Sequence, residues 1–275
     1  MNWQRWGVWA GLGLLVACGG GDDADPVPIP PPPPEPVNAA GLWVGSTNAG
    51  DDVQIIINED NVYWALSQYP LTLASGFVQG ALRVDEDDKT GETFLLDGRQ
   101  FQASGEVTAV RGEAVVVPES SLNGTATGVT NVRFNTVFDG RFYQSATFGA
   151  VEGNWQASLL NAVTGDRLPY GAVTVSRFGA MTGLGVAGGV ECTFTGNIIP
   201  EPARGYYSVS LTFSASRSCR LPGQTVNGIA VISGAGADAM LSLAALTTDR
   251  WQGVSAVFLP TPPAPTPTPT PTPTP

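Results

Sequence analysis

Hydrophobic and polar positions alternate in short runs along most of the chain, beginning at Gly41. Between residues 41 and 84 stand the runs GLWVGST, DVQIIIN, NVYWALS and ASGFVQGALRV, which glycine, asparagine and aspartate residues separate. Runs of this length with turn residues between them predict β-strands, and consecutive short strands are typical of antiparallel meanders or barrels. We therefore predict an all-β fold, in which closure into barrels would remove exposed strand edges.

An internal repeat divides this β region into two parts. GLWVGSTNA at Gly41 is echoed by GNWQASLLNA at Gly153, and SGFVQGALRV at Ser75 is echoed by CTFTGNIIPE at Cys192. The offset grows from about 112 to about 117 residues, as loop insertions allow. Chance similarity between glycine-rich strands is the alternative. We predict two related antiparallel β modules, barrel or sandwich-like, with their joint near residues 144–151.

Proline-rich segments flank these modules. DPVPIPPPPPEP predicts an extended polyproline II stalk, and a Thr-Pro repeat begins near Thr261. The predicted organisation is a signal peptide (1–17), a proline-rich linker (18–39), a first β module (40–143), a second β module (144–259) and a disordered Thr-Pro tail (260–275).

The first residues predict export and lipid attachment. Arg5 precedes an apolar segment at 6–16, which is too short to span a bilayer and fits a secretory signal. The segment ends in LVAC, with the cysteine at Cys18, and resembles the bacterial lipobox. The resemblance implies cleavage before Cys18, acylation of that residue with palmitate as the expected acyl group, and, because Gly19 follows, sorting to the outer membrane. An ordinary signal peptide with an incidental cysteine, or an uncut anchoring helix, is the alternative.

Composition excludes several kinds of chemistry. Removal of the signal leaves 12 basic residues against 24 acidic ones, and such a surface lacks the basic footprint of a nucleic-acid binder. The sequence has no histidine, which excludes Ser-His-Asp and Cys-His nucleophile systems and histidine metal sites. The acidic run DEDD at 85–88 predicts a solvated hairpin tip, with weak calcium binding as the alternative. No catalytic residue, metal or cofactor is predicted.

Two cysteines remain once Cys18 is assigned to the lipid. An oxidising compartment would join Cys192 and Cys219. Closing a loop of about 28 residues contributes about 3–4 kcal/mol in the chain-entropy model. A metal site is the alternative, but two thiols without histidine fall short of the four ligands of structural zinc. We predict a disulfide.

The segments CTFTG at Cys192 and LPGQTVNGIA at Leu221 carry a family resemblance. Together with SSLNGT at Ser120 and GLWVGST after a proline-rich leader, they resemble a group of uncharacterised proteobacterial lipoproteins. The resemblance covers most of residues 41–259 and implies no activity. In architecture, lipidated β-barrels also resemble, more distantly, surface lipoproteins such as transferrin-binding and factor-H-binding proteins, without a motif that would transfer their ligands.

Adjacent aromatic residues mark a candidate binding surface. Neighbours in a strand point to opposite faces, so one residue of Tyr63 and Trp64, and one of Tyr206 and Tyr207, must face outward or into a second interface. Packing between the two modules explains this pattern. A face that binds sugar, peptide or a protein partner would use the same residues. The sequence leaves both readings open.

These observations predict a lipid-anchored envelope protein with a non-catalytic binding or scaffolding role. Its expected partners are the lipid bilayer, through the acylated N-terminus, and an envelope or extracellular ligand. The side of the outer membrane that it occupies is open. One alternative is a carboxylate-dependent glycan hydrolase, which needs two acids facing each other across a groove. The other is a lipocalin-like carrier of an apolar ligand, which needs an open cavity inside a barrel.

Overall fold

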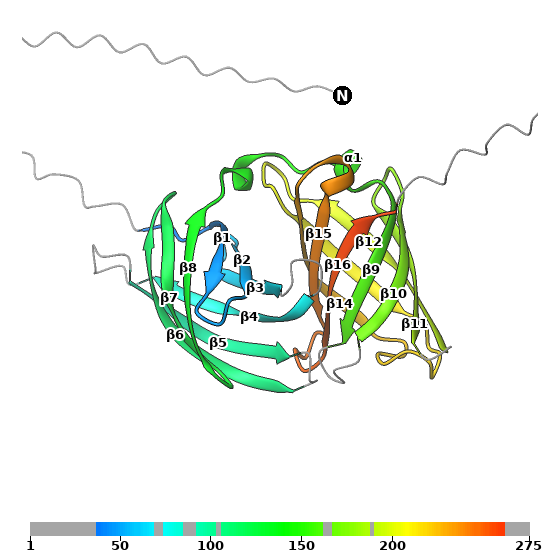
Figure 1. Cartoon of the computed structure of the whole chain (residues 1–275), viewed down its shortest axis with the longest axis horizontal. Coiled ribbons are helices and arrows are strands. Elements are labelled where there is room, and N and C mark those ends of the chain that lie inside the picture. The colour runs from blue at the N-terminus through cyan, green and yellow to red at the C-terminus, as the bar shows by residue number, and fades with distance from the viewer. Residues whose placement is uncertain are drawn as a thin grey trace, which may run out of the picture. The chain divides into compact units, whose positions relative to one another are not determined.

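The described part of the chain forms two closed antiparallel barrels of eight strands each (Figure 1). The structure is a computed structural model, and it describes residues 37–68, 74–84, 92–102, 106–161, 167–187 and 190–261. Cys18, the signal peptide, the linker before residue 37, the DEDD run and the tail beyond residue 261 lie outside these residues. Within them, no helix is long and apolar enough to cross a membrane.

In the first barrel, each strand pairs with the next one along the chain, and β8 closes the barrel on β1. The strands are β1 (Gly41–Thr47), β2 (Asp52–Ile57), β3 (Val62–Gln68), β4 (Ala74–Val84), β5 (Glu92–Gln102), β6 (Val107–Val117), β7 (Ser121–Thr127) and β8 (Asn131–Phe138).

The second barrel follows after a 3₁₀ turn, η1 (Gly140–Tyr143), and a short helix, α1 (Phe148–Val151). Its last strand closes on its first. The strands are β9 (Gly153–Asn161), β10 (Arg167–Val175), β11 (Ala180–Ala187), β12 (Val190–Pro200), β13 (Tyr207–Phe213), β14 (Thr225–Ser233), β15 (Met240–Leu246) and β16 (Gly253–Pro260), with the 3₁₀ turn η2 (Gly236–Asp238) before β15.

This architecture confirms the prediction of an all-β fold with two antiparallel modules, and it selects barrels over sandwiches. The echoed segments occupy matching strands, because GLWVGST forms β1 and GNWQASLLN forms β9. The tryptophans of the echo also share one contact. The indole Nε1 of Trp43 donates to the Ala39 carbonyl at 3.1 Å, and that of Trp155 donates to the Val151 carbonyl at 2.8 Å. Each buried indole thereby ties its first strand to the preceding segment.

Apart from bulges in β4, β5 and β10, the two barrels also pair their strands in the same register. In the first barrel, Trp43 pairs with Ile55, which pairs with Ala65. In the second barrel, Trp155 pairs with Val173, which pairs with Gly183. In the next part of the barrel, Tyr63 pairs with Gly80 as Met181 pairs with Gly196. Equivalent positions can therefore be compared directly between the two barrels.

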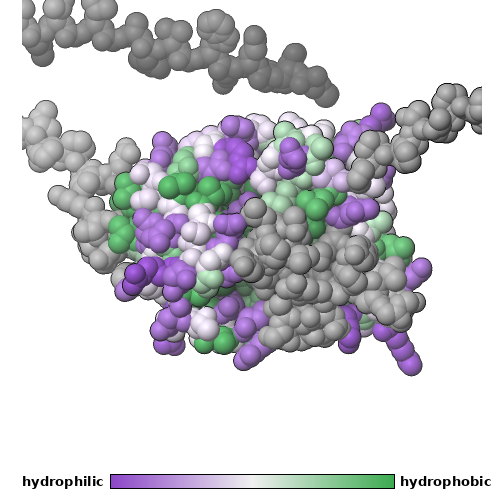
Figure 2. Space-filling view, viewed as in Figure 1, coloured by the Kyte–Doolittle hydropathy of each residue, from purple (hydrophilic) through white to green (hydrophobic). Residues whose placement is uncertain are grey.

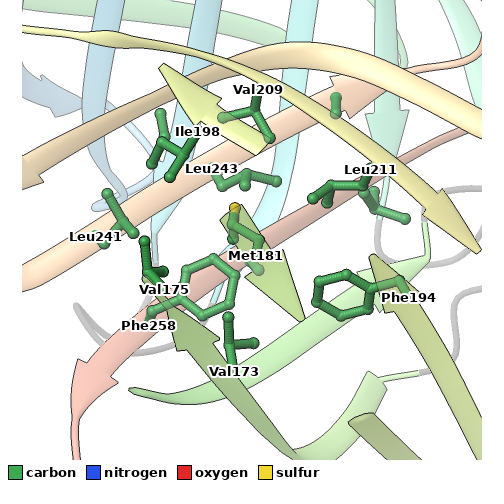
Figure 3. Packing of buried hydrophobic residues seen from close by; sticks show 14 of the residues in the cluster. Val173, Val175, Met181, Phe194, Ile198, Val209, Leu211, Leu241, Leu243 and Phe258 are labelled. Atoms are coloured by element: carbon green, nitrogen blue, oxygen red, sulfur yellow. The ribbon is translucent and has the colours of Figure 1, made fainter. Parts of the chain in front are cut away.

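Large apolar side chains fill the second barrel. Figure 3 shows them pointing toward one another from opposite walls, with Met181, Phe194 and Phe258 among them. Phe194 and Phe213 are neighbours across two strands, with ring centroids 5.7 Å apart. This interior is a packed core that leaves these side chains almost no exposure to solvent.

The predicted disulfide is present in the second barrel. Cys192 on β12 is bonded to Cys219 in the loop between β13 and β14, with Cα atoms 4.9 Å apart. Both cysteines are buried, and Leu221 of the same loop packs into the core beside them. The bond therefore holds this loop against the barrel.

An apolar cluster joins the two barrels through outward-facing side chains. Phe77 and Phe101 of the first barrel stack with centroids 4.7 Å apart and pack with residues of β14 and β15. The cluster also contains Phe142 of η1, which connects the barrels along the chain. At one edge of this interface Arg250, in the β15–β16 turn, forms an ion pair with Asp97 of β5.

Candidate functional site: a cavity in the first barrel

The first barrel contains a cavity of about 100 Å³. Most of its wall is aliphatic, and inward residues from all eight strands contribute to it. The lining consists of Thr47, Val53, Ile55, Ile57, Tyr63, Ala65, Val78, Leu82, Thr93, Gln100, Val110, Ala114, Leu122, Ala126, Gly128, Thr130, Val132 and Phe134.

Smaller side chains at equivalent positions explain why this barrel is hollow. On β4, Val78 pairs with Gln100, whereas the equivalent pair in the second barrel is Phe194 with Phe213. On the opposite wall, the equivalent pairs are Ala114 with Gly124 in the first barrel and Ala230 with Leu243 in the second. These two pairs are smaller in the first barrel, although Phe134 stands there where the second barrel has Ala256.

The two ends of the first barrel differ. At the end where β1 begins, Trp43 is fully buried and meets Phe138 edge to face, with ring centroids 5.3 Å apart. At the other end the cavity reaches Thr47 and the β7–β8 turn, where Gly128 and Thr130 lie. One end is therefore plugged by aromatic side chains, and the cavity extends toward the other.

The polar groups of the lining are few and uncharged. The Thr93 hydroxyl donates to the Ala114 carbonyl at 3.2 Å, and the Thr47 hydroxyl accepts from the backbone N–H groups of Ala49 and Asp51 at 3.2 Å each. Gln100 Oε1 accepts a long hydrogen bond of 3.4 Å from the Val129 N–H. Among the described residues of the lining there is no aspartate, glutamate, lysine or arginine. An ionised ligand would find no opposite charge in this wall.

Tyr63 is the exception among these polar groups. Its side chain is 3% exposed, and its hydroxyl is buried without a hydrogen-bond partner among the described residues. Burial raises the pKa of this hydroxyl well above its usual range, with Arg250 opposing the shift and Asp97 adding to it. The hydroxyl reaches β5 at Gly98, where an added Cβ would collide with it. Glycine at this position therefore makes room for the tyrosine.

The four aromatic residues predicted as a possible binding surface lie in three different places, and three of them are buried while Trp64 is partly buried. Tyr63 faces the cavity, Tyr207 is in the core of the second barrel, and Trp64 and Tyr206 pack in the cluster between the barrels. Trp64 stacks against Phe77 with centroids 6.2 Å apart. These four rings therefore do not form one exposed face. Neighbouring residues of a strand point to opposite sides, and the rings that point out of their barrel pack in the contact between the two barrels.

Among the described residues, large exposed apolar side chains occur on both barrels, and three of them, Val115, Val117 and Val137, lie close together on the outer face of β6 and β8. The large ones are Val115, Val117, Val129, Val137, Tyr143, Phe178, Ile199, Trp251 and Leu259. On the face shown in Figure 2, hydrophobic residues lie in small groups among hydrophilic ones. Single exposed apolar side chains are common on protein surfaces.

Several carboxylates of the described residues lie at turns, whereas Asp97, Glu113 and Glu191 lie within strands. Asp51 and Asp52 stand at the β1–β2 turn, and Glu59 and Asp60 at the β2–β3 turn, where Glu59 forms an ion pair with Arg204. Within the described ranges, no group of three or more Cys, Asp or Glu residues could hold a metal ion.

Most of the cavity residues were missed by the sequence analysis, which singled out Tyr63 for its aromatic ring alone. The available signal was the run of small residues at every second position of two consecutive strands. These are Gly112 and Ala114 on β6, and Gly124 and Ala126 on β7. Side chains two apart share a face of a strand, so such runs indicate a barrel wall with little side-chain volume.

Comparison with known proteins places the chain in no family. No protein-family model matches it, and no solved structure matches it. A segment of 83 residues is 30% identical to the teichoic acids export ATP-binding protein TagH of Staphylococcus epidermidis, covering 30% of the chain and 31% of that protein. The chain thus spans about a third of the length of this relative. The resemblance to proteobacterial lipoproteins stays a prediction.

Proposed function

We propose that this protein is a lipid-anchored binding protein of the bacterial envelope, without catalytic activity, whose first barrel takes up a small apolar molecule or group. The observation that carries the proposal is the contrast between two barrels of one register, of which one is filled and the other hollow. This contrast favours the carrier among the functions considered from the sequence.

The size of the cavity sets the size of the ligand. Its volume of about 100 Å³ is of the same order as the roughly 150 Å³ apolar cavity that takes up benzene or xenon in an engineered protein. A ligand, or the part of a ligand that enters the barrel, therefore has about the size of one six-membered ring. The wall gives such a group apolar contact on every side, and its burial is favourable by about 25 cal/mol per Å².

Benzene tests the cavity directly. We expect it to bind to the purified chain, raising the melting temperature and shifting the methyl NMR signals of Ala114 and Ala126. The double variant Val78→Phe, Gln100→Phe copies the phenylalanine pair of the second barrel and should abolish both effects. Ala109→Val, on the exposed face of β6, is the control that should retain them. Absence of benzene binding to the unaltered chain would refute the cavity as a binding site.

The proposed location rests on the N-terminal sequence and on the disulfide. The Cys192–Cys219 bond is of a kind that forms in oxidising compartments such as the periplasm and the cell surface. Two or more acyl chains on Cys18 would hold the protein stably on a membrane, whereas one chain binds only reversibly.

Metabolic labelling with a palmitate analogue tests the anchor. Cys18→Ala should lose the label, while the double variant Cys192→Ala, Cys219→Ala should keep it. Label retained by Cys18→Ala would show that the lipid, if any, is attached elsewhere. Protease treatment of intact and permeabilised cells then distinguishes a surface-exposed protein from a periplasmic one.

A further inference from the structure

The cavity of the first barrel runs from a buried end to an exposed one. Near the aromatic plug its lining includes Ile57 and Leu122, which are buried. At the other end it is lined by Thr130, which is exposed, and by Thr47 and Gln100, which are partly buried. An exposed residue in the lining places this end of the cavity at the protein surface. We call this end, with Thr47, Gln100 and Thr130 around it, the mouth.

The equivalent end of the second barrel is closed by a loop. The connection between β13 and β14, residues 214–224, carries Cys219 and Leu221, which are both buried in the core of that barrel. The disulfide from Cys219 to Cys192 holds the loop in this position. In the first barrel the equivalent strands are β5 and β6, which residues 103–106 alone connect. This connection is too short for a counterpart of that loop.

Hydrogen-bonding side chains gather at the mouth. Thr47, Gln100 and Thr130 all carry a hydroxyl or an amide. The Gln100 amide lies directly against the β7–β8 turn, because an added Cβ on Gly128 would collide with its Oε1. The hydrogen bond that this oxygen accepts from the Val129 N–H is long, at 3.4 Å. The mouth therefore offers hydrogen bonds to a polar group in contact with solvent, whereas the wall below it offers mainly apolar contact.

We infer that the ligand of the first barrel is an amphiphile that enters with its apolar end first and leaves its polar remainder at the mouth. The inference rests on the proposed function and adds the class and the orientation of its ligand. The cavity has room for about one six-membered ring, so a longer molecule must extend through the mouth into solvent. Burial of its apolar end is favourable, while its polar groups keep hydrogen bonds to water, Thr130 or Gln100.

Benzene and phenylbutanol, whose ring and hydroxyl stand at opposite ends of a butyl chain, form the probe pair. Benzene fits inside the cavity, whereas phenylbutanol fits only if its chain passes through the mouth. In the full chain we expect phenylbutanol to bind at least as tightly as benzene. NMR contacts should place its ring near the Leu122 methyl groups and its hydroxyl end near the Thr130 methyl group.

Two substitutions in the β7–β8 turn test the route. Thr130→Phe places a ring at the mouth and should weaken phenylbutanol binding about tenfold or more, while the benzene affinity stays within about twofold. Val129→Phe is the matched control, because it adds the same ring at an exposed residue of this turn that is not among the described lining residues. It should leave both affinities within about twofold.

The outcomes separate this inference from the proposed function. If benzene does not bind to the unaltered chain, the cavity is not a binding site and the proposed function fails. If benzene binds but phenylbutanol does not, the function survives and the inference is overturned. Equal effects of Thr130→Phe and Val129→Phe on phenylbutanol would also overturn it, because the chain of the ligand would then not leave through the mouth.

Discussion

Ala114 and Ala230 occupy equivalent positions in surroundings of different density. On the neighbouring strand, Ala114 pairs with Gly124, whereas Ala230 pairs with Leu243. Ala114 borders the cavity, whereas Ala230 is 1% exposed within the packed core. Replacing alanine with a larger residue would therefore add methyl groups into empty space at Ala114 and into occupied space at Ala230.

The substitution of valine at these two alanines measures that difference. We expect Ala114→Val to stabilise the protein by about 0.5–1 kcal/mol, as cavity-filling changes commonly do. Ala230→Val should destabilise it by about 1–3 kcal/mol through overpacking. Denaturant unfolding of both variants gives the two free energies. Destabilisation of equal size in both would mean that the first barrel is as tightly packed as the second.

At the scale of elements, β5 connects the cavity wall to the second barrel. Its register shifts between Leu95 and Gly98, and Asp97 there has a positive φ of 47°. The shift turns Asp97 toward Arg250, whose guanidinium also donates to the Asp97 carbonyl at 2.7 Å and to Gln79 Oε1 at 2.7 Å. Arg99 of the same strand donates to the Arg250 carbonyl at 2.7 Å. The irregular part of β5 is thus held by the β15–β16 turn.

Removal of Arg250 tests this contact. Arg250→Ala leaves the buried Gln79 side chain without its donor, so we expect a loss of about 1–3 kcal/mol in the free energy of unfolding. The exposed ion pair with Asp97 adds little. Arg177→Ala, in the β10–β11 turn, is the control and should change stability by less than about 0.5 kcal/mol. Chemical denaturation of the two variants decides, and equal effects would contradict a specific role for Arg250.

The strands and their grouping into two modules could be predicted because alternation and repetition are local properties of a sequence. The glycine, tryptophan and turn pattern of GLWVGST and GNWQASLLN already marked two equivalent first strands. The cavity could not be predicted in this way, because it depends on which residues face each other across strands, such as Val78 and Gln100. That pairing depends on register shifts in β4 and β5, which the pattern of hydrophobic residues does not show.

At the scale of the described chain from residue 37 onward, the segment between the barrels is fastened to both. Asp139 follows β8, and its carboxylate accepts hydrogen bonds from the Arg141 backbone at 2.9 Å and side chain at 2.8 Å. Arg141 in turn donates to the Ile232 carbonyl of β14 at 2.9 Å. One carboxylate therefore positions the arginine that contacts the second barrel.

Acid should loosen this connection. Burial acts to raise the pKa of Asp139, but the hydrogen bonds and charge of Arg141 outweigh it, so the net pKa is lowered. A carboxyl whose pKa is lower in the folded state stabilises it fully above the unfolded pKa of about 3.9, and this contribution is lost as the pH falls through the folded value.

The free energy of unfolding, measured for the unaltered chain and Asp139→Asn between about pH 6 and pH 3, checks this expectation. The unaltered chain should be the more stable of the two at the upper end, and the gap should narrow toward the lower end. A gap that stays constant over this range would show that Asp139 does not change its proton affinity on folding.

The presence of two similar barrels in one chain helps to explain how a barrel with an internal cavity can remain stably folded. A protein with one barrel that gave up its central side chains would lose core packing and stability together. In a tandem pair, the second copy keeps a full core and a covalent cross-link, and it shares an apolar wall with the first. Mutations that empty the first copy are then tolerated as long as the whole chain stays above its stability threshold. The packed second barrel can thus offset the core packing that the first barrel gives up around its cavity.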